Sequence, residues 1–108
     1  MRRAEAAAPA CDLGALGGGR GRHRRLTAAL LGAALATADT RRGWRLELPA
    51  EPRWGRAAAA WIGLERRCCP FVGFELRWTR GGRLFLDAVA APAGREALRA
   101  GLRAALGG

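Results

Sequence analysis

The sequence contains no lysine, serine, asparagine, glutamine or tyrosine, and only one histidine. The absence of serine excludes a Ser-His-Asp triad. All nineteen basic residues are arginines, and with nine acidic residues they give a formal net charge of +10. Because arginine is spread along a chain that is also rich in alanine and glycine, we attribute much of this charge to compositional bias. Neither a helix-turn-helix nor an RNP-like aromatic pattern is present, so no nucleic-acid partner is expected.

Long apolar runs are also absent. The longest apolar and alanine-rich stretch, residues 26–38, is shorter than the ~20 residues that a membrane-spanning helix needs. Residues 1–3 resemble the start of a signal peptide, but no apolar segment follows them directly. We therefore expect a cytoplasmic protein without membrane association. Its 108 residues suffice for one domain.

Cysteine is sparse, with three residues, of which Cys68 and Cys69 are adjacent. Neighbouring Cα atoms lie about 3.8 Å apart, which is shorter than the ~4.4–6.8 Å that disulfides prefer. A bond between these two residues would be strained, and a framework of structural disulfides is not expected. Reduced thiols in a reducing compartment fit this pattern better.

The order of predicted elements is α-β-α-β-β-α. Helical spacing and breaker residues predict helices over 20–38 and 53–69 and from 92 onward, and alternation predicts strands over 44–48, 73–79 and 83–89. This order predicts a small two-layer α+β domain over residues 20–108, with a three-stranded sheet and helices packed on one face. Residues 1–19 are expected to form a flexible N-terminal segment, because they lack periodicity and end in three glycines.

The most concentrated chemical signal is the cysteine pair at the end of the second predicted helix. Glu65 precedes Cys68 by three residues and Cys69 by four, which places the carboxylate on an adjoining part of the helix surface. Two adjacent thiolates cannot both reach one ion without backbone strain, but Cys11 could supply a third sulfur. Thiolate sets of this kind suit Cu(I), Hg(II) or As(III). Zinc stays open, because Glu65 or His23 could add a fourth ligand.

The reactivity of the pair depends on opposing charges. Arg66 and Arg67 favour the thiolate, whereas the partial negative charge of the helix C-terminus disfavours it. Our leading hypothesis is a non-enzymatic site, formed by Cys11, Glu65, Cys68 and Cys69, that binds a soft ion as sensor, carrier or resistance accessory. The ion is the only cofactor expected. A homodimer that pools two cysteine pairs would offer four thiolates.

Two alternatives stay open. In the first, Cys68 or Cys69 is the nucleophile of a thiol-redox protein. In the second, the protein is a non-catalytic interaction module whose cysteines are core residues, because Cys68 lies on an apolar stripe with Trp61 and Leu64. His23, within an arginine cluster, is expected to be exposed and incidental.

The segment from Trp61 to Phe71 matches the pattern W-x-x-L-E-R-x-C-C-P-F. With the triplet from Phe74 to Leu76 that follows, it resembles an uncharacterised family of small bacterial proteins that carry this pattern between a helix and a strand. The triplet that begins at Cys11 resembles the opening of the same family, so the likeness covers most of the chain from that residue. The glycines at 17–19 and the Ala- and Arg-rich first helix depart from it. The resemblance implies the same four positions to test: Cys11, Glu65, Cys68 and Cys69.

Overall fold

The computed structural model describes residues 11–107, and their fold is α+β. A four-stranded antiparallel sheet has the strand order β1-β2-β4-β3. The elements are η1 (Leu13–Gly19), α2 (Arg20–Ala33), β1 (Ala36–Thr40), β2 (Gly43–Leu48), α3 (Pro52–Cys68), β3 (Gly73–Trp78), β4 (Leu84–Val89) and α4 (Pro92–Gly107). None of the helices within this described part of the chain is long and apolar enough to cross a membrane.

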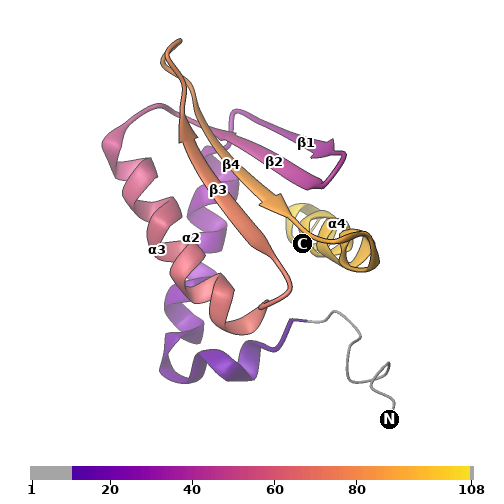
Figure 1. The fold of residues 1–108 in the computed structure, drawn as a ribbon. Coiled ribbons are helices and arrows are strands. Elements are labelled where there is room, and N and C mark those ends of the chain that lie inside the picture. The colour runs from indigo at the N-terminus through magenta and orange to yellow at the C-terminus, as the bar shows by residue number, and fades with distance from the viewer. Residues whose placement is uncertain (1–10, 108) are drawn as a thin grey trace.

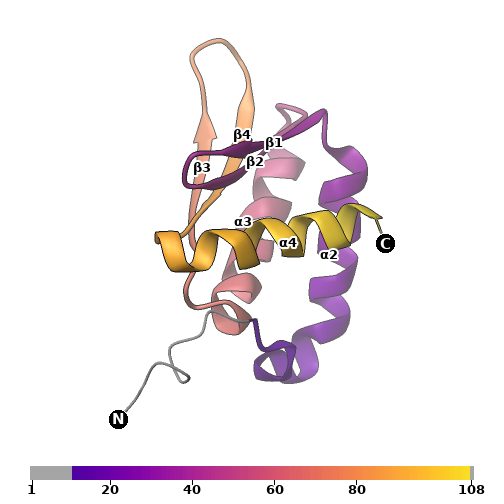
Figure 2. The same cartoon turned by 90° about the vertical axis from the view of Figure 1, so that its right-hand side faces the viewer.

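The sheet buries one face against the helices and leaves the other face polar. On the buried face, Leu46 pairs with Leu86, which pairs with Leu76 of the next strand. All three α-helices lie on this side (Figures 1 and 2). On the opposite face, Arg45 Nε donates to Asp87 Oδ1 over 2.7 Å, which compensates a carboxylate that is almost fully buried. Two layers therefore share one core between the sheet and the helices.

The prediction of three strands is wrong, because β1 adds a fourth strand at the edge of the sheet. The sequence predicts a first helix that extends to residue 38, but α2 ends at Ala33, and Ala34 leaves the helical region with ψ 129°. Residues 36–39 are exposed, so no apolar alternation marks this strand in the sequence. Alanine favours helix in isolation, and pairing with β2 overrides that preference.

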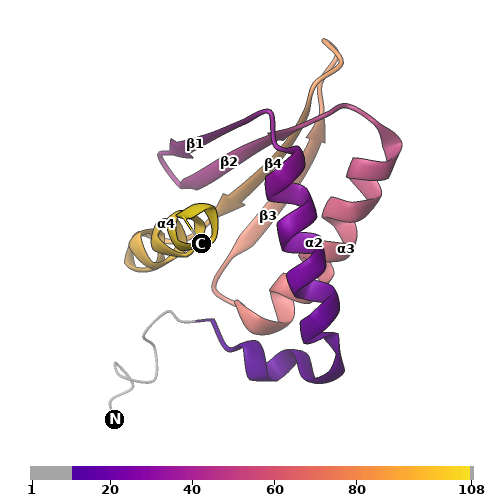
Figure 3. The same cartoon turned by 180° about the vertical axis from the view of Figure 1, so that it is seen from behind.

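Helix α3 is the element that carries the cysteine pair. Pro52 occupies its first turn, where a missing N–H costs nothing, and Ala58, Trp61, Leu64 and Cys68 are buried along one stripe. Its bounds agree to within one residue with the predicted 53–69. Seen from behind, α2 packs along α3 and together they cover one part of the sheet (Figure 3).

Part of the N-terminal segment that was predicted to be flexible is helical. Residues 13–19 form η1, a 3-10 helix with a kink at Gly17, and Leu16 within it is buried. The Asp12 side chain accepts a hydrogen bond from the Gly14 N–H, and the Asp12 N–H donates to the carbonyl of Cys68 over 2.7 Å. These contacts fix η1 against the end of α3. Residues 1–10 of the predicted segment lie outside the described residues.

Candidate thiol site

Cys11 and Cys69 form a disulfide, and their Cα atoms are 4.4 Å apart. The structure therefore contradicts the expectation that all three cysteines are reduced thiols. The backbone hydrogen bond from Asp12 to Cys68 places Cys11 beside Cys69 although 58 positions separate the two cysteines. The short Cα separation of adjacent residues disfavours only a Cys68–Cys69 bond, which does not form in the structure, and Cys69 bonds to the distant Cys11 instead.

Cys68 is a free thiol directly beside this disulfide. Its Sγ lies 3.7 Å from Sγ of Cys69, and both residues are fully buried, with exposed fractions of 0% and 1%. The two adjacent sulfurs point to the same place because the chain leaves the helix between them: Cys69 has φ −128° and ψ 68°, and Pro70 follows. The end of the helix between Cys68 and Cys69 thus allows the two sulfurs to converge.

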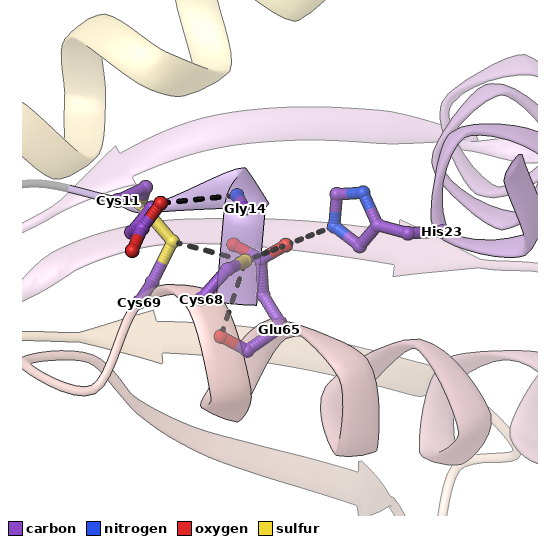
Figure 4. Close-up of a disulfide and its surroundings, with 7 residues drawn as sticks. Cys11, Gly14, His23, Glu65, Cys68 and Cys69 are labelled. Carbon is purple, nitrogen blue, oxygen red and sulfur yellow. Dashed lines mark hydrogen bonds and ion pairs between the residues drawn. A yellow bond between two sulfur atoms is a disulfide. The ribbon is translucent and has the colours of Figure 1, made fainter. Parts of the chain in front are cut away.

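A carboxylate and an imidazole continue this arrangement away from the disulfide (Figure 4). Glu65 Oε2 lies 4.0 Å from Sγ of Cys68 and is hydrogen-bonded to His23 Nε2. Both side chains are only about one-seventh exposed. The contacts thus run from the Cys11–Cys69 disulfide through Cys68 to Glu65 and His23.

His23 is largely buried, contrary to the sequence-based expectation that it is exposed. Its ring stacks on Trp61 with 6.3 Å between centroids and 17° between planes. One turn further along α2, Thr27 accepts a hydrogen bond from the Trp61 indole over 2.9 Å. The spacing of His23, Thr27 and Leu30 places all three on the buried stripe of α2. That spacing is a signal in the sequence, and the surrounding arginines obscured it.

The pKa of the Cys68 thiol is raised above its ordinary value. Burial is the main cause, followed by the negative charge of Glu65, while a backbone hydrogen bond acts in the opposite direction. Arg67 does not offset this, because its guanidinium turns toward η1 and donates to the carbonyl of Ala15 over 3.3 Å. Cys68 is therefore a protonated thiol at neutral pH, and a soft ion would have to displace that proton.

Two overlapping sets of potential ligand atoms occur among residues 11–107. Cys11, Glu65 and Cys69 form one set, and His23, Glu65 and Cys68 form the other; within each set the atoms lie within 4.8 Å of one another. Glu65 belongs to both sets. All four sequence-predicted site residues therefore meet in one place, and His23 is an addition to them.

The thiol site opens into an apolar cavity of about 410 Å³ between α2, α3, α4 and the sheet. All three cysteines, Glu65 and His23 line one part of it. Aromatic and aliphatic side chains line the remainder, among them Trp44, Trp61, Phe74, Leu30, Leu98 and Leu102. The sulfurs of Cys68 and Cys69 are therefore buried from bulk water but border a space that a small molecule could enter, whereas Cys11 is exposed.

Alkylation of Cys68 in the native, oxidised protein is expected to be slow and strongly dependent on pH. Only the thiolate reacts, so the rate with iodoacetamide should rise about tenfold per pH unit until the pH exceeds the raised pKa. We would measure labelling by mass spectrometry, with the denatured oxidised chain as the control. If the rate in the native protein stops rising at the same pH as in the denatured chain, or at a lower pH, the fold does not hold Cys68 as a neutral thiol.

Comparisons with known proteins leave this site to be interpreted from its own geometry. No family model, no curated protein and no solved structure matches the chain. The resemblance to the small bacterial proteins with the W-x-x-L-E-R-x-C-C-P-F segment therefore stays a prediction.

Proposed function

We propose that the reduced protein binds one soft metal or metalloid ion, such as As(III), Hg(II) or Cu(I), through the sulfurs of Cys11, Cys68 and Cys69. The observation that carries this proposal is the meeting of three sulfurs from two distant segments beside the Glu65 carboxylate. Thiolates are the preferred ligands of soft ions. Reduction of the Cys11–Cys69 bond frees two further thiols next to Cys68 and leaves them close enough to share an ion.

Glu65 gives this site a route for the proton that must leave. A thiol binds a soft ion as the thiolate, so its proton must leave, either to a base or, with arsenite, on the hydroxide that departs as water. A buried thiol has few bases near it. Glu65 Oε2 lies 4.0 Å from Sγ of Cys68 and contacts His23 on its other side. We assign to the pair the acceptance of the Cys68 proton as the ion binds.

Burial of Cys68 and Cys69 also fits the alternative in which both are core residues. The side chains beside the sulfurs favour a binding site over a core role for the cysteines. A carboxylate placed beside buried sulfurs is costly to desolvate, and it raises the pKa of the adjacent thiol. An apolar residue at position 65 would pack against a cysteine core without either cost. The pairing of Glu65 with His23 is thus better explained by a binding role.

Thiol–disulfide exchange is a second candidate function, because Sγ of Cys68 lies 3.7 Å from Sγ of Cys69 in the disulfide. Attack by the Cys68 thiolate would form a Cys68–Cys69 bond and release Cys11 as a thiolate, with the Cys68 proton passing to Glu65. The raised pKa of Cys68 lowers the fraction of attacking thiolate at neutral pH. Ion binding meets the same obstacle, but exchange in addition forms a bond between adjacent cysteines, which their short Cα separation strains. This candidate therefore ranks below ion binding.

The test is metal binding by anaerobic, fully reduced protein, titrated with arsenite, Hg(II), Cu(I) and Zn(II). We expect one soft ion per chain, and a loss of affinity of about 100-fold or more in the Cys68→Ser/Cys69→Ser double variant, because two of three thiolates are lost. Cys68→Ala and Cys69→Ala variants, compared by thermal unfolding, separate a folding defect from a binding defect. Affinity no higher than that of dithiothreitol would contradict the proposal.

The proposed site also bears on location and assembly. We infer that the protein acts in the cytoplasm, because ion binding requires the reduced state of Cys11 and Cys69. A homodimer with a shared four-thiolate site would require the buried Cys68 and Cys69 to become accessible to a second copy. Ion stoichiometry and solution mass, measured together, distinguish one ion per chain from one ion per pair.

A further inference from the structure

The cavity beside the thiol site is larger than a soft ion requires. Its volume is about 410 Å³. An ion held by three sulfurs would occupy only the end formed by the cysteines. For comparison, an engineered apolar protein cavity of about 150 Å³ binds benzene. The rest of the cavity therefore has room for an organic group of at least that size.

The walls of the cavity match an apolar ligand. Three aromatic rings of the lining contact one another: Phe74 packs edge-on against Trp61 at 5.3 Å between centroids, and Trp44 is tilted against Trp61 at 6.3 Å. The Trp61 indole N–H is already bonded to Thr27, which leaves the ring as an apolar surface. The two side chains of the lining that carry a carboxylate or an imidazole, Glu65 and His23, are bonded to each other.

We propose, on the basis of the thiolate function proposed above, that the ligand is a trivalent organoarsenical with one aryl or short alkyl substituent. As(III) with one carbon substituent takes two thiolates, and the structure provides two buried sulfurs 3.7 Å apart in Cys68 and Cys69. The organic substituent then lies in the apolar cavity. In the reaction R–As(OH)2 and two thiols give R–As(S)2 and two molecules of water, with no change of oxidation state.

The geometry favours this class over an organomercurial. An R–Hg(II) cation forms its strongest bonds in a line, with one thiolate opposite carbon, and uses a single sulfur. Cys68 and Cys69 lie side by side, which suits two positions on the same side of a pyramidal As(III) centre. Cys11, at the exposed rim, is not needed for this ligand, although reduction of its bond to Cys69 is required first.

Burial of a phenyl group should make the protein selective in a measurable way. We would determine Kd for phenylarsine oxide and for arsenite with anaerobic, reduced protein, and divide each by the value for dithiothreitol under the same conditions. This ratio removes the intrinsic preference of any dithiol. The protein is expected to favour the phenyl compound by about 10- to 100-fold beyond dithiothreitol, because the ring is removed from water.

Two glycine variants locate the organic group. Gly101 in α4 lines the cavity, and a Cβ there would meet no atom within 4 Å beyond its chain neighbours and the helix backbone, so Gly101→Leu places apolar atoms at the cavity rim. Gly63 in α3 has equally open surroundings but does not line this cavity, so Gly63→Leu is the matched control. We expect Gly101→Leu to lose most of the preference for the phenyl compound while binding arsenite normally. The control should behave as the unmodified protein.

The outcomes separate this inference from the function on which it rests. Tight binding of arsenite with no preference for the phenyl compound beyond that of dithiothreitol would overturn the inference and leave ion binding intact. A preference that Gly101→Leu does not change would also overturn it, because the ring would then lie elsewhere. If neither compound binds to the protein more tightly than it binds to dithiothreitol, both proposals are refuted.

Discussion

Reduction of the Cys11–Cys69 disulfide is expected to lower the melting temperature of the protein by about 15–20 °C. The bond joins residues 58 positions apart, and closing a loop of that length in the unfolded chain corresponds to about 4 kcal/mol of stability on the chain-entropy account. For a chain of 108 residues, the entropy of unfolding converts this free energy into a shift of about that size. Thermal unfolding with and without a phosphine reductant measures it.

Single-cysteine variants provide the controls for this measurement. Cys11→Ser cannot form the bond, so it should melt near the reduced protein, with or without reductant. Cys68→Ser retains the bond, so its melting temperature should still fall with reductant, although loss of the buried thiol lowers the melting temperature that it has before reduction. A shift of less than about 3 °C in the unmodified protein would show that the unfolded chain gains little freedom when the bond is broken.

The elements with clear periodicity could be predicted from the sequence. The apolar stripe of α3 and the alternation of β3 and β4 each indicated the observed element to within about one residue. Strand β1 could not be predicted in this way. It lies at the edge of the sheet, and four of its five residues are exposed, so neither of its faces carries an apolar pattern. Only pairing with β2 defines it, and that pairing is a property of the folded chain.

In the candidate site, too, sequence spacing predicts the proximity of some residues, whereas only the folded chain brings the others together. Glu65, Cys68 and Cys69 lie within one turn at the end of α3, so their spacing alone indicates that they meet. Cys11 and His23 reach the same place through tertiary structure. The packing of η1 on α3 brings Cys11 to its partner, and the packing of α2 on α3 brings His23 to Glu65. Sequence spacing could name Cys11 as a candidate but could not predict its bond to Cys69.

Oxidation of the site is expected to lower its affinity for arsenite by about 100-fold or more. In the oxidised protein, the sulfurs of Cys11 and Cys69 are bonded to each other and have no thiolate to offer. Cys68 remains as a single thiol, and its raised pKa keeps it protonated at neutral pH. The number of available thiolates falls from three to at most one, and each lost As–S bond costs at least about tenfold. Titration of matched oxidised and reduced samples measures the difference.

The same coupling must operate in the opposite direction, because binding and oxidation compete for the same sulfurs. Protein loaded with arsenite should form the Cys11–Cys69 bond more slowly, under a fixed glutathione poise, than protein without it. Cys11→Ser provides the control, since it cannot form this bond and should not show the protection.

Equal affinity of the oxidised and reduced forms would contradict the whole scheme, because arsenite would then bind without the sulfurs that the disulfide removes. If arsenite binds only to the oxidised form, binding is assigned to Cys68, Glu65 and His23, the set of potential ligands that the disulfide leaves untouched.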